Sequence, residues 1–129
     1  MSDKFSIEII SPEKTILKSE TREATIPSFE GQMGILKDHI PLITFLRPGI
    51  ILIKDQEEKK YYVEEGIVEF SNNKLLILTS TANNLKNFEK EIIDRLINDA
   101  EKKLKVNNIT DKEKYIVSYK IDTLREINR

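Results

Sequence analysis

The stretch I-P-S-F-E-G-Q-M-G-I-L-K-D-H-I-P-L, residues 26–42, decides the fold of this chain. It holds two of the four glycines, two of the four prolines and the only histidine. Apolar strand formers alternate there with turn formers, which is typical of a shaped β-hairpin at an exposed edge. Gly31 and Gly34 suit a backbone that needs a positive φ angle or a close approach. Three apolar side chains are expected to face outward, wholly or in part, and to be covered by a partner: Phe29, Met33 and Ile35.

Around this stretch, the chain up to Ser80 shows an apolar period close to two. Short runs rich in β-branched and aromatic residues are separated by turn signals, which predicts a flattened β-sandwich or barrel. These runs are residues 5–9, 50–53, 61–63, 67–70 and 75–78. Asn72 and Asn73 stand between two of the runs and indicate a two-residue hairpin, because asparagine tolerates positive φ.

After Ala82 the apolar period becomes helical. The first stripe predicts an amphipathic helix of about five turns, capped by Asn83, Asn84 or Asn87. Its members are Leu85, Phe88, Ile92, Leu96, Ala100 and Leu104, with Ile93 and Ile97 beside them.

A second helix follows the capping box of Thr110 and Glu113 and runs to about Asn128. Its apolar face carries Val117, Ile121 and Leu124. A short connection between two such helices indicates an antiparallel hairpin. We therefore expect a β-sandwich domain at residues 1–84 and a helical hairpin domain at residues 85–129.

Composition limits the functional classes. The 129 residues are 39% hydrophobic and 33% charged, with a net charge of −1, which argues against nucleic acid as a partner. The absence of cysteine excludes disulfides and thiol chemistry. No apolar run approaches the roughly 18 residues of a membrane span, and the start of the chain shows no signal-peptide pattern. These features are typical of a cytoplasmic protein.

No set of residues indicates catalysis. His39 is the one side chain expected to titrate near neutrality, and Asp38 beside it does not complete a catalytic triad. A loop histidine bonded to backbone or partner explains it better. Residues 55–60 (D-Q-E-E-K-K) indicate a solvated hairpin tip, since metal-ligand spacing is missing. Gly31 and Gly34 lack the lysine of a phosphate loop. We expect no enzyme activity, no metal and no cofactor.

The chain resembles the epsilon subunit family of bacterial F-type ATP synthases, which corresponds to the mitochondrial delta subunit. The resemblance is carried by Ser28, Glu30, Gly31, Gln32, Met33, Gly34, Ile35, His39, Pro41 and Leu42. Further matches at G-I-V-E (residues 66–69) and L-T-S-T-A (residues 78–82) extend it along the chain. It implies a sandwich of about ten strands and a two-helix hairpin. It also implies a non-catalytic rotor subunit of the central stalk, peripheral to the cytoplasmic face of the cell membrane.

The resemblance also implies partners, namely the gamma subunit and the membrane c-ring. The residues it assigns to this interface are Glu30, Gly31, Gln32, Met33, Gly34, Ile35, Asp38 and His39. The family often has an acidic residue at the position of Gln32, so an ionic ring contact is not expected there.

In the family this chain resembles, the helical hairpin folds beside the sandwich or extends toward the catalytic alpha/beta hexamer and inhibits ATP hydrolysis. The cations that correspond here are Lys112, Lys114, Lys120, Arg125 and Arg129, of which Arg125 is the leading candidate. A solvated helix face explains these cations equally well. Some relatives bind ATP through an apolar-Asp-x-x-Arg-Ala signature at residues 88–93. Here Glu89 and Ile92 replace the aspartate and the arginine, so we expect no ATP binding.

Two other classes of function remain as alternatives. A stand-alone β-sandwich binding module would need an aromatic platform or a basic groove, and neither is evident in the loops. An enzyme would need a nucleophile in addition to His39.

Overall fold

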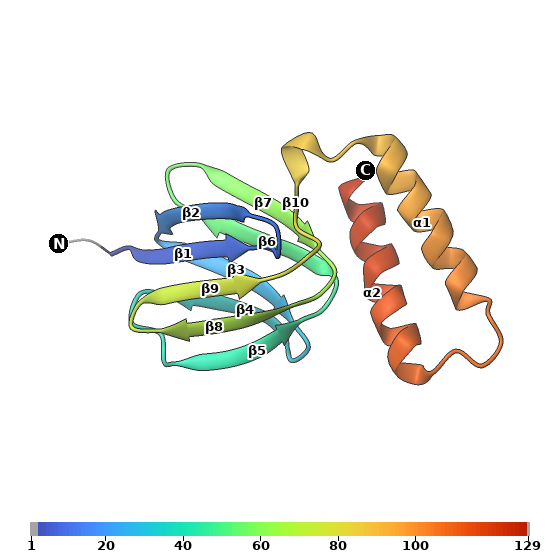
Figure 1. The fold of residues 1–129 in the computed structure, drawn as a ribbon, viewed down its shortest axis with the longest axis horizontal. Helices are drawn as coiled ribbons and strands as arrows, with labels where there is room; N and C mark the ends of the chain where they lie inside the picture. The colour runs from blue at the N-terminus through green and yellow to red at the C-terminus, as the bar shows by residue number, and fades with distance from the viewer. Residues whose placement is uncertain (1–2, 129) are drawn as a thin grey trace.

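The computed structural model describes residues 3–128 and has ten strands followed by two α-helices (Figure 1). The strands are β1 (Phe5–Ile10), β2 (Thr15–Thr21), β3 (Glu23–Ser28), β4 (Gly31–Leu36), β5 (Leu42–Leu46), β6 (Gly49–Lys54), β7 (Glu58–Val63), β8 (Gly66–Ser71), β9 (Lys74–Leu78) and β10 (Asn83–Asn84). A 3-10 turn, η1 (Leu85–Asn87), leads to α1 (Lys90–Leu104) and α2 (Asp111–Ile127). The predicted fold class, a flattened sandwich followed by a helical hairpin, is confirmed.

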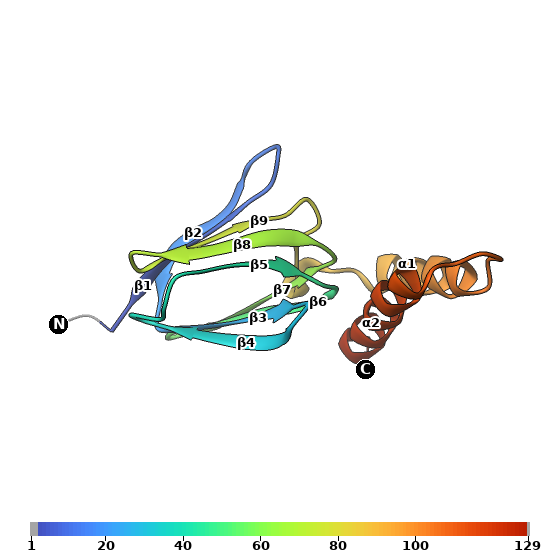
Figure 2. The same ribbon diagram turned by 90° about the horizontal axis from the view of Figure 1, so that it is seen from below.

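The strands form one curled sheet that folds into two layers (Figure 2). One layer holds β5, β8, β9, β1 and β2, and the other holds β4, β3, β6, β7 and β10. The layers join where Ser28 of β3 pairs with Leu46 of β5. All neighbours are antiparallel except β1 and β9. Alternate residues of each strand fill the space between the layers, for example Ile7, Ile26 and Val68.

The β8–β9 connection confirms the hairpin predicted from Asn72 and Asn73. Both residues have positive φ, 50° and 56°, and Ser71 pairs directly with Lys74. A two-residue loop with positive φ at both positions matches the right-handed twist of the strands it joins.

The first helix differs from the prediction, because it begins at Lys90 and not near Leu85. Asn84 does act as a cap, but it caps η1 by accepting a 3.0 Å hydrogen bond from the Lys86 backbone N–H. Phe88 then has an extended backbone, and its ring stacks on Tyr62 at 5.3 Å. Packing of this ring thus overrides the helical pattern. The buried face of this helix also differs from the predicted apolar stripe, since Ile93 is buried and Ile92 is exposed.

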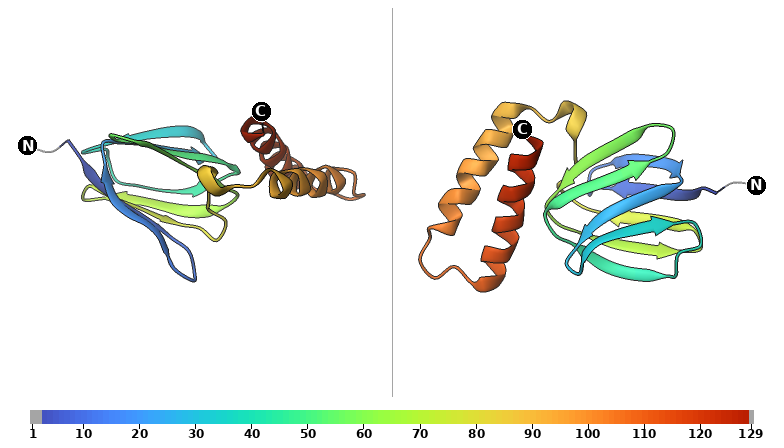
Figure 3. Two further views of the ribbon diagram at one scale, coloured as in Figure 1. Left: turned by 90° about the horizontal axis from the view of Figure 1, so that it is seen from above. Right: turned by 180° about the vertical axis from the view of Figure 1, so that it is seen from behind.

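The second helix and its capping box are confirmed. The Thr110 hydroxyl accepts from the Glu113 N–H at 3.1 Å, and the Glu113 carboxylate accepts from the Thr110 N–H at 3.3 Å. Val117, Ile121 and Leu124 are buried, as predicted. The two helices run antiparallel and lie together beyond one end of the sandwich (Figure 3).

This capping box gives a prediction about acid. Hydrogen bonds from the Thr110 hydroxyl and N–H, with a smaller contribution from the Lys103 charge, hold the pKa of the Glu113 carboxyl below its usual range. The bonds therefore stabilise α2 fully above the usual carboxyl pKa and are lost as pH falls through the lowered pKa. We expect the Thr110 and Glu113 amide signals in NMR to shift together at that lower pH.

The control for this titration is Glu113→Gln, which keeps an oxygen acceptor and cannot ionise. In that variant the two amide signals should no longer shift together with acid. A Glu113 carboxyl that titrates at the ordinary glutamate pKa in the unsubstituted chain would contradict the prediction.

Candidate functional site

The hairpin predicted from residues 26–42 is formed by β3 and β4, which pair from Glu23↔Leu36 to Ser28↔Gly31. The Ser28 hydroxyl closes the turn, since it donates to the Gly31 carbonyl at 2.7 Å and accepts from the Glu30 N–H at 3.2 Å. Gly31 has a φ of +119°, a conformation that other residues rarely adopt. Among the strands of residues 3–128, β4 pairs with β3 alone, so it is an edge strand, as predicted.

The alternation along β4 corrects one prediction. Ile35 was expected to face a partner, but it is fully buried and packs in the sandwich core. Met33 is half-buried and packs against the same core. The side of β4 that faces outward is formed by Gln32, Gly34 and Leu36, and we call these three residues the β4 outer side. Sequence reasoning missed Leu36, which is 57% exposed.

Asp38 and His39 do not join Glu30 in one loop. They lie in the β4–β5 connection, and the length of β4, roughly 17 Å for five steps, separates them from the Phe29–Glu30 turn. Asp38 has a φ of 68° and exchanges two hydrogen bonds with Asn73, at 2.7 and 2.9 Å. The His39 Nδ1 donates to the Ile40 carbonyl at 2.7 Å. Both residues thus stabilise the turns at the sandwich end remote from the helices (Figure 1).

A second exposed surface lies on the opposite layer and was missed by the sequence. Four large apolar side chains project outward from β5, β8 and β9: Ile43 (69% exposed), Phe45 (58%), Ile67 (45%) and Leu78 (43%). Phe45 pairs with Ile67, and Ile67 pairs with Leu78, so three of them form one row across the strands. We call these four residues the outer apolar face. The sequence does contain a feature that predicts this face. Strand β5 carries apolar residues on both of its sides, which indicates a strand that is covered on both sides.

The helical hairpin packs on the sandwich through a small apolar cluster. Tyr62 of β7, Ile93 of α1 and Leu124 of α2 are its buried members, and Phe88 stacks on the Tyr62 ring. Burial, helped by the nearby Glu64 carboxylate, raises the pKa of the Tyr62 hydroxyl far above its usual range. That hydroxyl donates to Glu64 at 3.0 Å.

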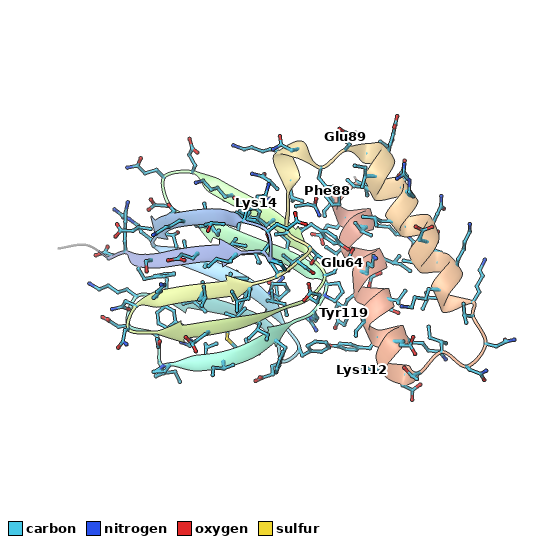
Figure 4. All side chains as sticks on the ribbon, viewed as in Figure 1. Lys14, Glu64, Phe88, Glu89, Lys112 and Tyr119 are labelled. Atoms are coloured by element: carbon cyan, nitrogen blue, oxygen red, sulfur yellow. The ribbon has the colours of Figure 1, made fainter. Side chains whose placement is uncertain are left out.

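An aromatic and cationic group holds the other part of α2, and Figure 4 labels one of its members, Tyr119, on the side of α2 that faces the sandwich. The Arg47 guanidinium lies 3.9 Å from the centre of the Tyr119 ring and donates to the Tyr115 hydroxyl at 2.8 Å. The Tyr115 ring stacks on Phe29 with a centroid distance of 5.8 Å. We call these four residues the Arg47 latch. It connects α2 with two turns of the sandwich, including the turn that carries Glu30.

The cations predicted to contact the catalytic hexamer occupy different surroundings. Lys120 pairs with Glu64 at 3.2 Å across the junction of α2 and the sandwich, and Arg125 pairs with Glu101 of α1 at 2.6 Å. Lys112 and Lys114 are exposed near the start of α2. Arg129 lies outside the described residues. The structure therefore does not gather these side chains into one cluster.

Within residues 3–128, no three histidine, aspartate or glutamate side chains come together as a metal site. Neither described helix is long and apolar enough to cross a membrane. The positions that match the nucleotide signature lie at the start of α1, where Glu89 is the N-cap and Ile93 packs into the cluster with Tyr62.

The chain is similar to one known family, to two curated relatives and to two solved structures. Residues 4–85 match the family described as ATP synthase, Delta/Epsilon chain, beta-sandwich domain. An ATP synthase epsilon chain of Pelagibacter ubique is 52% identical and covers 99% of this chain and 100% of its own length. An ATP synthase epsilon chain of Dichelobacter nodosus is 34% identical, and the match covers 81% of this chain and 75% of the length of that relative.

Two solved structures share the fold. One is the Euglena gracilis mitochondrial ATP synthase (OSCP/F1/c-ring), with a TM-score of 0.82, 19% identity and coverage of 100% of this chain and 84% of that one. The other is the Tetrahymena thermophila mitochondrial ATP synthase (central stalk/c-ring), with a TM-score of 0.66, 16% identity and 96% coverage of both.

Proposed function

Since this chain belongs to the ATP synthase delta/epsilon chain family, we propose that it is a rotor subunit of the F-type ATP synthase central stalk, between the gamma subunit and the membrane c-ring. The proposal is supported by full-length similarity to an epsilon chain and by a fold shared with chains of two ATP synthase complexes. In this role the chain couples ring rotation to ATP synthesis by its shape and contributes no catalytic group.

One observation carries the proposal, namely the outer apolar face on β5, β8 and β9. Four large apolar side chains exposed on neighbouring strands are costly in water and mark a protein-binding surface. We assign this face to gamma. Its centre is Ile67, flanked by Phe45 and Leu78.

We assign the β4 outer side and the adjoining Phe29–Glu30 turn to the c-ring. This surface lies on the layer opposite the outer apolar face (Figure 2), so the sandwich presents one binding surface on each side, as a wedge between two partners requires. Of the predicted interface residues, Glu30, Gln32 and Gly34 face outward here. Gly31, Met33 and Ile35 shape and support the strand from its inner side. Asp38 and His39 fix the remote turns.

The helical hairpin is docked on the sandwich, and we propose that it leaves this position to contact the alpha/beta hexamer and restrain ATP hydrolysis. Lys114 is exposed and forms no salt bridge within the described residues, so it can meet an acidic surface, whereas Lys120 and Arg125 would first exchange their present partners, Glu64 and Glu101. Through its complex the chain is peripheral to the cytoplasmic face of the cell membrane. We expect this chain itself to bind no nucleic acid, metal or nucleotide.

The test is co-purification. Solubilised membranes should yield this chain together with gamma and the c-ring after affinity capture of any one of them. Recovery of the chain as a monomer, while gamma and the ring stay together without it, would contradict the rotor proposal and favour a stand-alone binding module.

The c-ring assignment gives a second prediction. In Gly34→Val the added side chain has open space, since, apart from Gly34 and its two chain neighbours, no heavy atom of residues 3–128 lies within 4 Å of the place that a Cβ atom would take, and the Gly34 φ angle is not in the left-handed region. Valine also favours strands, so the isolated chain should unfold at the same temperature or higher. If the ring backbone approaches Gly34 closely, overpacking of about 1–3 kcal/mol should reduce retention of the c-ring roughly 5- to 150-fold.

The matched control for this substitution is Thr25→Val, which changes the residue paired with Gly34 and adds almost no volume. Its c-ring retention should equal that of the unsubstituted chain. Equal retention for Gly34→Val as well would remove this side of β4 from the c-ring interface.

A further inference from the structure

A cleft of about 780 Å³ lies between the sandwich and the helical hairpin. Its wall is mostly apolar. The sandwich contributes Phe45, Pro48 and Ile67, and the helices contribute Ala100, Ile116 and Val117. A cleft of this size falls in the range that binds ligands or inserted side chains, and leaving such a wall in water is costly.

The cleft is continuous with the outer apolar face. Phe45 and Ile67 belong to both surfaces, and they pair directly across β5 and β8. A partner that covers Ile43 and Leu78 on the sheet therefore also reaches the mouth of the cleft. At the Phe45–Ile67 pair, no polar residue separates the two surfaces. A small molecule in the cleft would leave most of the outer apolar face exposed, so a polypeptide accounts for more of the apolar surface.

The charges at the rim indicate the chemistry of that polypeptide. The carboxylates on the sandwich side are engaged, since Glu64 binds Lys120 and Tyr62, and Glu65 accepts from Ser80. Lys103 and Lys112 on the helical side form no salt bridge within residues 3–128, although Lys103 is near enough to Glu113 to lower its pKa.

One acidic residue, Asp99, lies on the helical side of this rim. The two lysines Lys103 and Lys112 outnumber it. The exposed part of the helical rim is therefore suited to an acidic side chain of the partner.

We propose that a segment of the subunit that covers the outer apolar face inserts into this cleft, with apolar side chains against Ile116 and Val117 and a carboxylate facing Lys103 and Lys112. The proposal rests on the proposed function, which assigns that face to gamma. It adds that gamma contacts both the sandwich and the docked hairpin. Occupation of the cleft would then stabilise the docked position of the hairpin.

Photo-crosslinking in the purified ATP synthase tests the proposal. A photoreactive phenylalanine analogue is placed at Ile116 in the cleft, at Phe45 on the outer apolar face, and at Ile92, which is exposed on α1 and does not line the cleft. We expect the Ile116 and Phe45 positions to crosslink to the same subunit, on neighbouring segments identified by mass spectrometry, and the Ile92 position to give no such product.

The outcomes separate the two proposals. The cleft proposal alone would be overturned if Phe45 crosslinks to gamma but Ile116 does not. The Ile116 position would then give no product, an adduct with a small molecule, or a product with a different subunit. The absence of any product with another subunit from Phe45 would count against the proposed function itself.

Charge reversal supplies a second measurement. Lys103→Glu with Lys112→Glu should weaken rebinding of the chain to an ATP synthase depleted of it by about tenfold, with the effect reduced at high salt. The matched control is Lys90→Glu with Lys102→Glu, which makes the same net charge change at exposed positions of α1 outside the cleft. Equal loss in both variants would show general electrostatic attraction and would overturn the acidic contact.

Discussion

Replacing Ile67 by aspartate is expected to remove this chain from the assembled ATP synthase, with a loss of affinity on the order of 100-fold or more. Ile67 lies at the centre of the outer apolar face, between Phe45 and Leu78. A carboxylate covered by gamma there would be buried without a partner charge, which is strongly unfavourable. The isolated chain should still fold, because the Ile67 side chain is exposed and the sandwich core lies on the other side of β8. Retention after detergent solubilisation, measured by quantitative mass spectrometry, checks this expectation.

The matched control is Ile92→Asp, which makes the same change at an exposed isoleucine in the first turn of α1. Aspartate is favourable near a helix N-terminus, so this variant should be retained normally. If Ile67→Asp lowers the stability of the sandwich, Ile67→Thr keeps the branched shape suited to a strand and should still be retained less than the unsubstituted chain. Normal retention of the folded Ile67→Asp chain would exclude this face as the gamma contact.

Local sequence rules predicted most of the fold. The asparagine pair at residues 72–73 identified a hairpin because backbone φ angles follow from the identity of the turn residues themselves. The capping box of Thr110 and Glu113 was predictable for the same reason, since its donors and acceptors are three residues apart. Strand periodicity then indicated which parts of the chain form the two layers.

The errors arose where non-local packing decides the outcome. A shift of one residue along β4 exchanges its inner and outer sides, and pairing with β3 sets that register so that Ile35 faces the core. The α1 start moved to Lys90 because the Phe88 ring packs on Tyr62, a contact with a strand far away in the sequence.

The binding surfaces were harder to predict than the fold, for a related reason. The outer apolar face is assembled from β5, β8 and β9, and no short motif contains all of it. The same holds for the Arg47 latch, whose guanidinium binds tyrosines about seventy residues away along the chain. A resemblance to a family indicated which partners to expect, but the pairing of strands was needed to find which side chains are exposed on each side of the sandwich.

Removing the hairpin and loosening it should have opposite effects on ATP hydrolysis. Truncation after Asn84 is expected to raise the hydrolysis rate, because it deletes every cation proposed to contact the hexamer. We propose that residues 1–84 remain folded and assembled, since the main core cluster lies entirely within the sandwich and the cluster shared with the hairpin has one buried sandwich residue, Tyr62. The rate is measured on purified complexes that contain equal amounts of gamma.

Loosening is achieved from the sandwich side by Arg47→Ala with Glu64→Gln. These substitutions remove the latch contacts to Tyr115 and Tyr119 and the ion pair to Lys120, and leave the hairpin sequence intact. The docked state should lose about 1–2 kcal/mol, roughly 5- to 30-fold in its equilibrium. Because the released hairpin is free to reach the hexamer, hydrolysis should fall.

The control for this pair is Arg22→Ala with Glu57→Gln, which makes the same types of change at sandwich turns remote from the hairpin and should leave hydrolysis unchanged. A hairpin that only stabilises the sandwich would give no rise on truncation and no fall on loosening. A rise in both variants would mean that the docked hairpin is itself the inhibitory state, because either change then relieves the restraint. Only the combination of a rise and a fall requires that the hairpin inhibits by leaving the sandwich.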